Sequence, residues 1–386
     1  MKMNRTKSWL ICLGLVPLTA FMIQCKKNVA ADGASGTASN PSLNGAQVIA
    51  FVHPALLNTQ ASLDLIASQT NGGDADRTAA YQKVTDFINS HKYPTSFPAT
   101  VVVGSNGATS PSKNQIRSDS ELAYATALRW AKTGNATYAT QTIAILNGWA
   151  KNFKDYALLD GDTNANQPDL EASWTTPTFV AAAEIIRYYK VNGQSAGWSD
   201  ADINQFSAFL TLVKDNYINK IPKYNNNWDA SAGYAKMAIG VFLNSTTVYQ
   251  NGYDFVKTYL PVVINPDGTL LELCDRKDCV HYQYSLTAFA YAAEIARLQG
   301  DNSLWTMNSN LISKGYDFMR KAYDRTTGCN YCTVNSPVFP GTEVAYNYYK
   351  TANLKTLREL QPPLGVPNDN TFLGFTTYTH FGVTGL

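Results

Sequence analysis

Two short polar stretches of the chain combine side chains that could move a proton on a charged substrate. The first, YNNNWDAS, spans residues 224–231, and the second, RKDCVHYQY, spans residues 276–284. Each stretch leads into an apolar tract that is long enough for a buried helix. The candidate catalytic side chains in the two stretches are Asn226, Asn227, Arg276, His281, Tyr282 and Tyr284.

These residue types suit one reaction, β-elimination from a uronic-acid polysaccharide. The proton on C5 of a uronate is a very weak acid until the adjacent carboxylate is neutralised. Arg276 and the two amides could neutralise it through hydrogen bonds to both carboxyl oxygens. A tyrosine or histidine could then remove the C5 proton, and a phenol could return a proton to the leaving oxygen O4. Because tyrosine has an ordinary pKa of about 10, a neighbouring arginine would help by favouring the phenolate.

Simpler interpretations of the same residues exist. Asparagine is common at helix starts, so Asn226 and Asn227 could be simple helix caps. His281 and the tyrosines could be core residues at the start of a helix. A polar site is favoured because a cation, an imidazole and phenols lie within the nine residues 276–284, at one element boundary.

Most of the chain after residue 46 is predicted to be helical. Ser199 and Asp202 have capping-box spacing, and apolar side chains at i, i+3 and i+4 follow them. Ser118 and Glu121 have the same spacing, and we expect the helix that they open to end at Gly134. A short strand is predicted at 100–104. Further helical tracts are predicted at residues 61–70, 76–90, 136–153, 174–190, 228–244, 281–299 and 302–323.

These elements predict an all-α fold. Consecutive amphipathic helices with short connections suggest antiparallel helical hairpins arranged in a ring, an (α/α) toroid or incomplete α/α barrel. Alanine-rich tracts such as FVAAAEIIRYY would let the helices pack closely. A layered helical bundle is the alternative. In a toroid the ends of the inner helices and their loops line one groove, so polar clusters at helix starts are candidate site residues.

The N-terminal part predicts export. Residues 1–25 combine a basic start with an apolar run that ends in FMIQC, which indicates a signal peptide with a loose lipobox and Cys25 as the lipidated residue. Cleavage near NVAADG and secretion of a soluble protein is the alternative. Residues 26–46 are small and polar and are predicted to be a flexible tether. We expect residues 47–386 to form a single domain, either periplasmic, anchored to the outer membrane, or secreted.

Composition limits the partners. The formal net charge of +2 gives no bulk attraction for nucleic acid, so any polyanion would have to be recognised in a local groove. Aromatic residues make up 12% of the chain, which fits a thick aromatic core and also surfaces for sugar stacking. We expect a monomer that binds an acidic polysaccharide and contacts a membrane only through the lipid anchor.

The cysteines and one acidic loop could suggest metal sites. An exported protein meets an oxidising compartment, so two disulfides are expected, with the pairing left open. The C-x-x-C spacing of one pair also allows zinc. Residues 160–171 have oxygen ligands at calcium-loop positions, but Ala165 stands where glycine is needed and Pro168 also disagrees. A polar loop at the rim of the groove is favoured, and no metal or cofactor is expected. The cysteines after the leader are Cys274, Cys279, Cys329 and Cys332.

Three motifs together resemble the alginate-lyase-type polysaccharide lyases. They are HPALLNT at 53–59, NNW at 226–228, and the segment DGTLLELCDRKDCVHYQYSL at 267–286. The similarity spans roughly residues 51–300. It implies an α/α toroid, a lyase acting on β-linked uronans such as mannuronate-rich alginate or a β-1,4-glucuronan, and no obligatory metal.

The resemblance also suggests roles for individual residues. It puts Asn226, Asn227 and Arg276 on carboxylate neutralisers and Tyr282 on the acid/base tyrosine. Tyr284 and His281 remain alternatives, since positions 282 and 284 point about 200° apart on a helix. The residue that follows the amides is a tryptophan, where many relatives have a histidine that serves as base or neutraliser. The expected substrate-binding residues are Trp228, Trp174 and Arg117.

Two other functions compete with this interpretation. A glycoside hydrolase on the same toroid would need two carboxylates across the groove, and Asp229, Glu272 and Asp275 are available for that role. A lipid-anchored protein that only binds glycans would fit the aromatic content equally well. Such a binder would have no use for a buried cluster of arginine, histidine, tyrosine and asparagine. His53 and His380 are expected to be structural.

Overall fold

The computed structural model describes residues 50–367 and 370–386. The predicted signal peptide, the predicted lipidation site Cys25 and the predicted tether at 26–46 lie outside these ranges. Within them the chain is built from helices, and the α-helices are α1 (Gln60–Asn71), α2 (Ala75–Ser90), α3 (Pro111–Thr133), α4 (Ala136–Asn152), α5 (Gln167–Tyr188), α6 (Asp200–Asn216), α7 (Asn227–Phe242), α8 (Thr246–Val263), α9 (Leu271–Arg276), α10 (His281–Leu298), α11 (Ser303–Tyr323), α12 (Gly341–Tyr349), α13 (Ala352–Arg358) and α14 (Thr376–His380).

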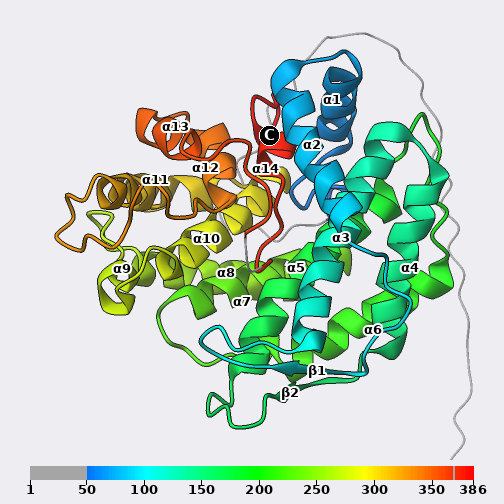
Figure 1. Cartoon of the computed structure of the whole chain (residues 1–386), viewed down its shortest axis with the longest axis horizontal. Helices are drawn as coiled ribbons and strands as arrows, with labels where there is room; N and C mark the ends of the chain where they lie inside the picture. The colour runs from blue at the N-terminus through cyan, green and yellow to red at the C-terminus, as the bar shows by residue number, and fades with distance from the viewer. Residues whose placement is uncertain (1–49, 368–369) are drawn as a thin grey trace, which may run out of the picture. The chain divides into compact units, whose positions relative to one another are not determined.

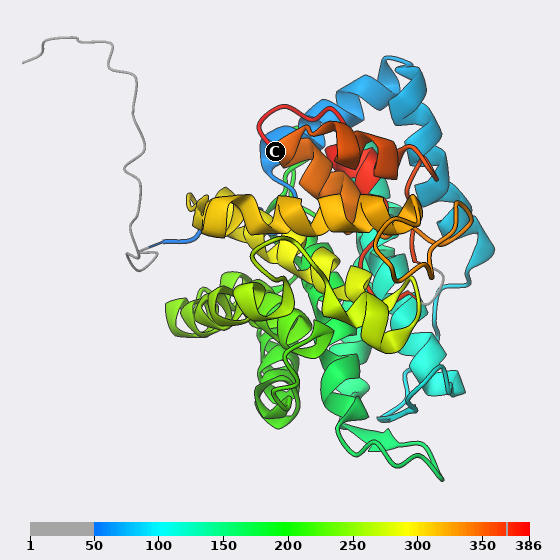
Figure 2. The same ribbon diagram turned by 90° about the vertical axis from the view of Figure 1, so that its left-hand side faces the viewer.

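Helices α3 to α11 form antiparallel hairpins with one inner and one outer helix each, so the predicted (α/α) toroid is confirmed (Figure 1). The inner helices α3, α5, α7 and α10 pack against one another in that order. Their partners α4, α6, α8 and α11 pack on the outside, and Figure 2 shows α10 and α11 beside α7 and α8. Inner helices are apolar or small on nearly every side, whereas the outer helices bury one face only.

Glycines allow the closest of these hairpins. A Cβ atom at Gly240 on α7 would collide with the backbone of Tyr249 on α8. A Cβ atom at Gly252 on α8 would lie 2.6 Å from the backbone nitrogen of Met237. The two helices therefore pack backbone against backbone, as expected for an interface rich in small residues.

Two short strands hold the loops at one end of the toroid. Strand β1 (Thr100–Val103), which was predicted, pairs in parallel with β2 (Asp155–Leu158), which was not. The loops that follow the strands are joined by Asp162, whose carboxylate accepts hydrogen bonds from the N–H and the hydroxyl of Ser105. This pairing places residues 104–109 beside residues 160–166.

Helix boundaries agree with the sequence to within about two residues for most of the predicted tracts. Helix α5 begins at Gln167 rather than at the predicted residue 174, and α8, α9, α12, α13 and α14 were not predicted. Helix α3 also begins earlier than predicted. Ser199 caps α6 as predicted, and Gly134 ends α3 in the left-handed conformation. The predicted cap at Ser118 is wrong, because α3 begins two turns earlier with Ser110 as the N-cap and Pro111 in the first turn. The polar residues before Ser118 are therefore helical.

None of the helices in the described ranges meets the length and hydropathy that a bilayer span requires. One hydrophobic core extends from Leu56 to Leu386 and includes residues of every inner helix.

His53 and His380 are structural, as expected. The His53 ring stacks on Tyr188, its Nδ1 lies 2.9 Å from Glu184 Oε2, and its Nε2 lies 2.9 Å from Asn244 Oδ1. These contacts tie the segment before α1 to the far ends of α5 and α7. His380 is buried beside Thr379, and burial lowers its pKa to about 3.

The tie made by His53 should depend on pH. Burial acts to lower the pKa of His53, but the bonds to Glu184 and Asn244 outweigh it, and the net direction is upward. A raised histidine pKa stabilises the fold fully below the unfolded value of about 6.5, and the contribution is lost as the pH rises through the folded value. The melting temperature of wild type minus that of His53→Gln, measured from pH 5 to 9, should therefore shrink with rising pH.

A matched control is His91→Gln, because His91 bonds only within its own helix end, to Ser90 and Phe87. Its difference from wild type should stay flat over the same range. A His53→Gln difference that grows with pH would contradict the assignment of the stabilising charge to His53.

Candidate active site

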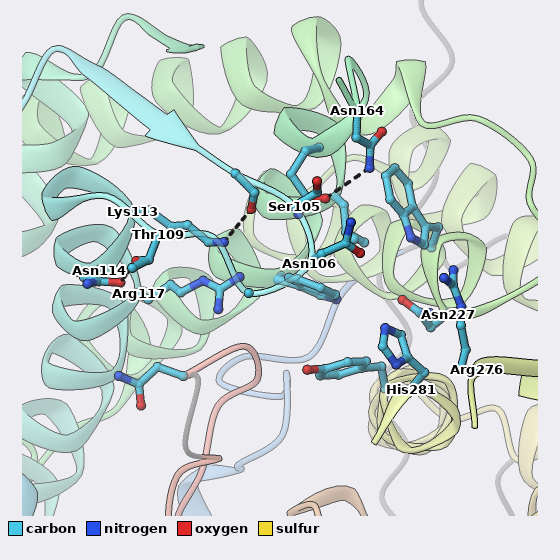
Figure 3. A pocket seen from close by; sticks show the side chains of 18 of the residues that line it. Ser105, Asn106, Thr109, Lys113, Asn114, Arg117, Asn164, Asn227, Arg276 and His281 are labelled. Carbon is cyan, nitrogen blue, oxygen red and sulfur yellow. Dashed lines mark hydrogen bonds between the residues drawn. The ribbon is translucent and has the colours of Figure 1, made fainter. Parts of the chain in front are cut away.

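A pocket of about 660 Å³ opens where the inner helices begin. Its walls come from the first two turns of α3, α5, α7 and α10, from α9, and from the loop between β1 and α3. Figure 3 shows Lys113 and Arg117 on one side and Asn227, Arg276 and His281 on the other. Because helix N-termini carry partial positive charge and free N–H groups, this end of the toroid favours anions.

The three asparagines at 225–227 have separate tasks. Asn225 adopts a left-handed backbone conformation, with φ of 57°. Asn226 caps α7, since its Oδ1 accepts the N–H of Trp228 at 3.0 Å and its own N–H donates to Asp229 at 3.2 Å. Only Asn227 lines the pocket. The expectation that Asn226 and Asn227 act together on a substrate is therefore wrong for Asn226, whose side chain is used by the helix.

Asn227 is held by a buried carboxylate on α9. Its Nδ2 donates to Glu272 Oε1 at 2.7 Å, and its backbone N–H donates to Glu272 Oε2 at 3.2 Å. The Ser285 hydroxyl on α10 donates to the same oxygen at 2.6 Å. Burial raises the pKa of Glu272, and these bonds, together with the charges of His281 and Arg276, act against the rise. Glu272 thus joins α7, α9 and α10 behind the pocket wall.

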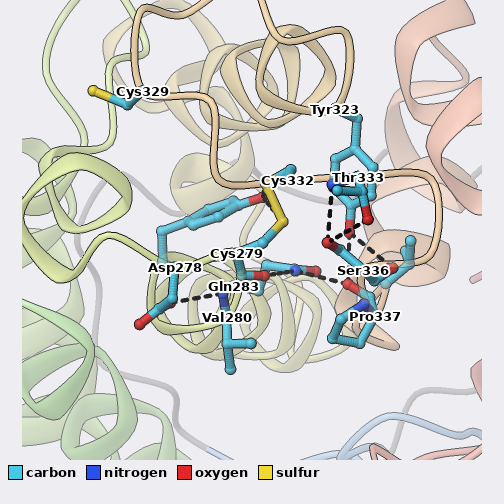
Figure 4. The surroundings of a disulfide bond; sticks show 12 residues. Asp278, Cys279, Val280, Gln283, Tyr323, Cys329, Cys332, Thr333, Ser336 and Pro337 are labelled. Carbon is cyan, nitrogen blue, oxygen red and sulfur yellow. Dashed lines mark hydrogen bonds between the residues drawn. A yellow bond between two sulfur atoms is a disulfide. The ribbon is translucent and has the colours of Figure 1, made fainter.

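Arg276 is an exposed residue at the end of α9 and lines the pocket. Two disulfides, Cys274–Cys329 and Cys279–Cys332, flank it. Both expected disulfides are therefore present, and both are cross-links to a distant loop rather than local pairs. Gln283 adds to the same link, because its amide donates to the carbonyl oxygens of Cys279 and Pro337 (Figure 4).

The first turn of α10 separates the three residues that were candidates for the base. His281 and Tyr284 line the pocket. Tyr282 points the other way and is fully buried, with its hydroxyl 3.3 Å from Cys332 Sγ and 3.4 Å from Cys279 Sγ. The expectation that Tyr282 faces the groove is wrong. Burial raises the pKa of Tyr282 well above its ordinary value, which makes a phenolate there still less accessible.

Tyr284 is packed between aromatic rings. Its ring centroid lies 5.1 Å from that of Trp174 and 5.1 Å from that of Phe339. The His281 ring lies perpendicular to it at 5.8 Å. The pocket thus presents an imidazole and a phenol side by side, each from the start of the same helix.

The opposite wall contains cations that the protein already uses. Arg117 pairs with Glu171 at 2.5 Å and lies 5.4 Å above the Trp174 ring. The Lys113 ammonium donates to the carbonyl oxygens of Gly104 and Ala108 at 2.7 Å each. The predicted substrate-binding residues Trp228, Trp174 and Arg117 all line the pocket.

Several polar residues of the pocket were not predicted. They come from the loop after β1, from the first turn of α3, and from the segment before α14. Their signal in the sequence is a run of small polar residues directly before or within a helix start, which is also the signal of an ordinary loop. These residues are Ser105, Asn106, Thr109, Lys113, Asn114 and Asn370. Asn164 and Gln167 also line the pocket, and both belong to the segment 160–171 that was expected at the rim of the groove.

The carboxylates that a hydrolase would need do not face the pocket. Asp229 is fully buried and accepts backbone N–H groups at the start of α7, Glu272 is buried against Asn227, and Asp275 does not line the pocket. In the loop considered for calcium, Asp162 binds Ser105, while Asn164 and Gln167 line the pocket rim. Within residues 50–367 and 370–386, no group of three His, Cys, Asp or Glu side chains could hold a metal ion.

Comparisons with known proteins show what the chain is similar to. The family model described as alginate lyase matches residues 58–327. The fold is similar to the crystal structure of alginate lyase A1-III from Sphingomonas species A1, with 17% identity, a TM-score of 0.64, and coverage of 84% of this chain and 97% of that chain. A search among curated proteins found no match.

Two further structures are similar. A variant of alginate lyase A1-III complexed with a tetrasaccharide has 15% identity and a TM-score of 0.64, and the match covers 85% of this chain and 96% of that one. An alginate lyase from Bacteroides ovatus has 12% identity and a TM-score of 0.62, with coverage of 83% and 98%. At these identities the structures show a shared fold.

The different tasks of Asn226 and Asn227 lead to a paired test. Serine caps helices about as well as asparagine, so Asn226→Ser should leave both turnover and melting temperature close to wild type. Asn227→Ser removes the amide held by Glu272, and turnover should fall about 100-fold. Steady-state kinetics with a uronan and thermal denaturation of both variants check this. Equal losses in the two variants would mean that the stretch acts only as a helix start.

Proposed function

The chain belongs to the alginate lyase family and is a polysaccharide lyase, and from this premise we propose that it cleaves a β-1,4-linked uronic-acid polysaccharide by β-elimination. The observation that supports the proposal best is that Arg276, His281 and Tyr284 line one pocket with Asn227. Mannuronate-rich alginate and β-1,4-glucuronan are the proposed substrates.

Neutralisation of the substrate carboxylate is the first requirement. Arg276 can donate two parallel hydrogen bonds to a carboxylate, and its exposed position between the disulfides leaves the guanidinium accessible. Asn227 gives one N–H of its amide to Glu272 and retains the other. With its charge matched, the carboxyl group can accept the electron density that develops when the C5 proton leaves.

Proton transfer is assigned to Tyr284 in place of Tyr282, because Tyr284 lines the pocket. The Tyr284 phenolate takes the proton from C5, the electron pair forms the C4=C5 double bond, and the C4–O4 bond breaks. The same phenol then gives the proton to O4 of the leaving chain. No water is consumed, and the products are one chain with a new reducing end and one with an unsaturated uronate.

A single tyrosine that performs both transfers requires H5 and O4 on the same face of the sugar. That relation holds in β-mannuronate and β-glucuronate and fails in guluronate. Trp228 has only an N–H donor and cannot supply a second base. The proposed enzyme therefore prefers polymannuronate or glucuronan over polyguluronate.

Export is part of the proposal. Two disulfides fit a chain that folds in an oxidising compartment. With the predicted leader and Cys25, we assign the protein to the periplasm or to a lipid anchor at the outer membrane, acting as a monomer on polysaccharide that reaches the cell surface.

The activity and the role of Arg276 can be tested together. Purified protein incubated with alginate, glucuronan and hyaluronan should produce ultraviolet absorbance from the new double bond. A hydrolase would release reducing ends without that absorbance, and a glycan-binding protein would give neither. Arg276→Ala should lower kcat about 100-fold or more. Arg129→Ala is the control, since Arg129 lies over the Tyr138 ring and not in the pocket. Wild-type turnover in a folded Arg276→Ala protein would rule out the mechanism.

The choice of tyrosine has its own test. Tyr284→Phe and Tyr282→Phe each remove one oxygen atom from neighbouring residues of the same turn. Tyr284→Phe should lower kcat on polymannuronate by about 100-fold or more, whereas Tyr282→Phe should leave it within a few-fold of wild type. The wild-type enzyme should cleave polymannuronate or glucuronan faster than polyguluronate. Cleavage of polyguluronate as fast as polymannuronate would contradict the single-tyrosine mechanism.

A further inference from the structure

His281 is held in place by a carboxylate that the mechanism above does not use. Asp278 Oδ1 accepts the N–H groups of Val280 and His281 at 2.8 and 2.9 Å, which satisfies the first free amides of α10. Its other oxygen, Oδ2, lies 2.6 Å from His281 Nδ1. Because a carboxylate only accepts, Nδ1 must donate and therefore holds a proton. The ring cannot turn without breaking this bond, so its second nitrogen has a fixed direction.

That second nitrogen, Nε2, belongs to a ring that lies in the pocket wall. His281 lines the pocket, and Figure 3 shows its ring next to Asn227, on the same wall as Arg276. Among the residues that the structure describes, no hydrogen bond is formed by His281 Nε2. The ring is 38% exposed on the pocket side of the helix, so a substrate group can reach it.

Without His281, the wall formed by Asn227 and Arg276 offers fewer hydrogen-bond donors than a carboxylate can accept. A uronate carboxylate accepts about four hydrogen bonds, and Arg276 can supply two. One N–H of the Asn227 amide is already given to Glu272, whose own charge lies behind the amide. A protonated His281 would supply a further donor and a positive charge at the same place.

Resting on the proposed function, we propose that His281 acts as an imidazolium that binds the substrate carboxylate together with Arg276. Asp278 is the positioning residue that keeps the proton on Nδ1 and fixes the direction of the ring. In this arrangement Tyr284 remains the group that moves protons, and His281 contributes charge without giving up its proton.

Charged groups face His281 from several elements. Asp278 contacts its ring, Glu272 lies behind the same wall, and Arg276 lines that wall. Lys113 and Arg117 lie across the pocket, with Arg117 paired to Glu171. A charged His281 that binds a carboxylate makes kcat/KM fall as the pH rises through its titration. A neutral His281 that acted as a base would make kcat/KM rise instead.

Two conservative variants separate these possibilities. Asp278→Asn keeps an oxygen for the amides of α10, since asparagine replaces aspartate well at helix starts, but removes the negative charge. We expect kcat/KM on polymannuronate to fall about tenfold, because the ring loses the carboxylate that fixes its direction. His281→Gln keeps a donor that does not titrate, so the limb that belongs to His281 should disappear, with kcat/KM about tenfold lower at pH 6.

Three outcomes would overturn the proposal. They are an alkaline limb that persists unchanged in His281→Gln, a profile of Asp278→Asn identical to wild type, and an acid limb that is lost in His281→Gln. The last result would identify His281 as the base. Melting temperatures within a few degrees of wild type would show that both variants are folded.

A binding measurement keeps the test independent of turnover. Calorimetry of Tyr284→Phe with a mannuronate trimer and with the matching neutral mannose trimer reports the contribution of the carboxylates. The uronate should bind at least tenfold more weakly when His281→Gln or Asp278→Asn is added, and the neutral trimer should be unaffected. If wild type forms no unsaturated product but this difference is found, the proposed function fails and the carboxylate clamp stands. If neither variant changes uronate binding, the clamp is wrong whatever the activity.

Discussion

The inner helices α3, α5, α7 and α10 all begin at the same pocket, and the rest of the site depends on this common direction. An antiparallel hairpin returns the chain to its starting end, so every inner helix of a toroid runs the same way. Four sets of unsatisfied N–H groups and four partial positive charges therefore lie at one end of the ring. A chain with a formal net charge of only +2 obtains a local preference for anions from its backbone before any side chain contributes.

Carboxylates then fix the donors at that end, and those of Glu171 and Glu272 are buried. Glu171 holds Arg117, Glu272 holds Asn227 and Ser285, and Asp278 holds His281. A negative charge inside an anion-binding pocket costs affinity for a polyanion, so these carboxylates make sense only as fixed acceptors. Three of the donors that they hold, Arg117, Asn227 and His281, line the pocket. The result is a preorganised wall in which little side-chain freedom remains to be lost when substrate binds.

The sequence predicted most of the secondary-structure elements. It predicted less well which side chains of an element line the pocket and which are buried. Period and capping residues located most of the helices, since those signals are local, but they missed α8 and the first two turns of α5. The succession of amphipathic helices and the order of the motifs indicated the toroid. Ser118 failed as a cap because Ser110 and Pro111 form a stronger start upstream. The choice of Tyr282 over Tyr284 failed because both occupy one turn, and only packing against the distant loop at 329–339 decides which of them is buried. Disulfide pairing and the partner strand β2 are likewise long-range facts that spacing does not encode.

The position of Arg276 shows why long-range cross-links are needed here. Helix α9 has six residues, too few to be stable alone, and it ends at Lys277 in a left-handed conformation. An exposed arginine on such a segment would lose its place in the pocket through ordinary fluctuation. Cys274 and Cys279 bind this segment on both sides of the arginine to residues 329 and 332, which themselves form no helix or strand. Neither segment has enough buried apolar surface to order itself, so covalent bonds replace a core at this point. Such bonds persist where thiols are oxidised, so the disulfides that order Arg276 fit a protein that folds in an oxidising compartment.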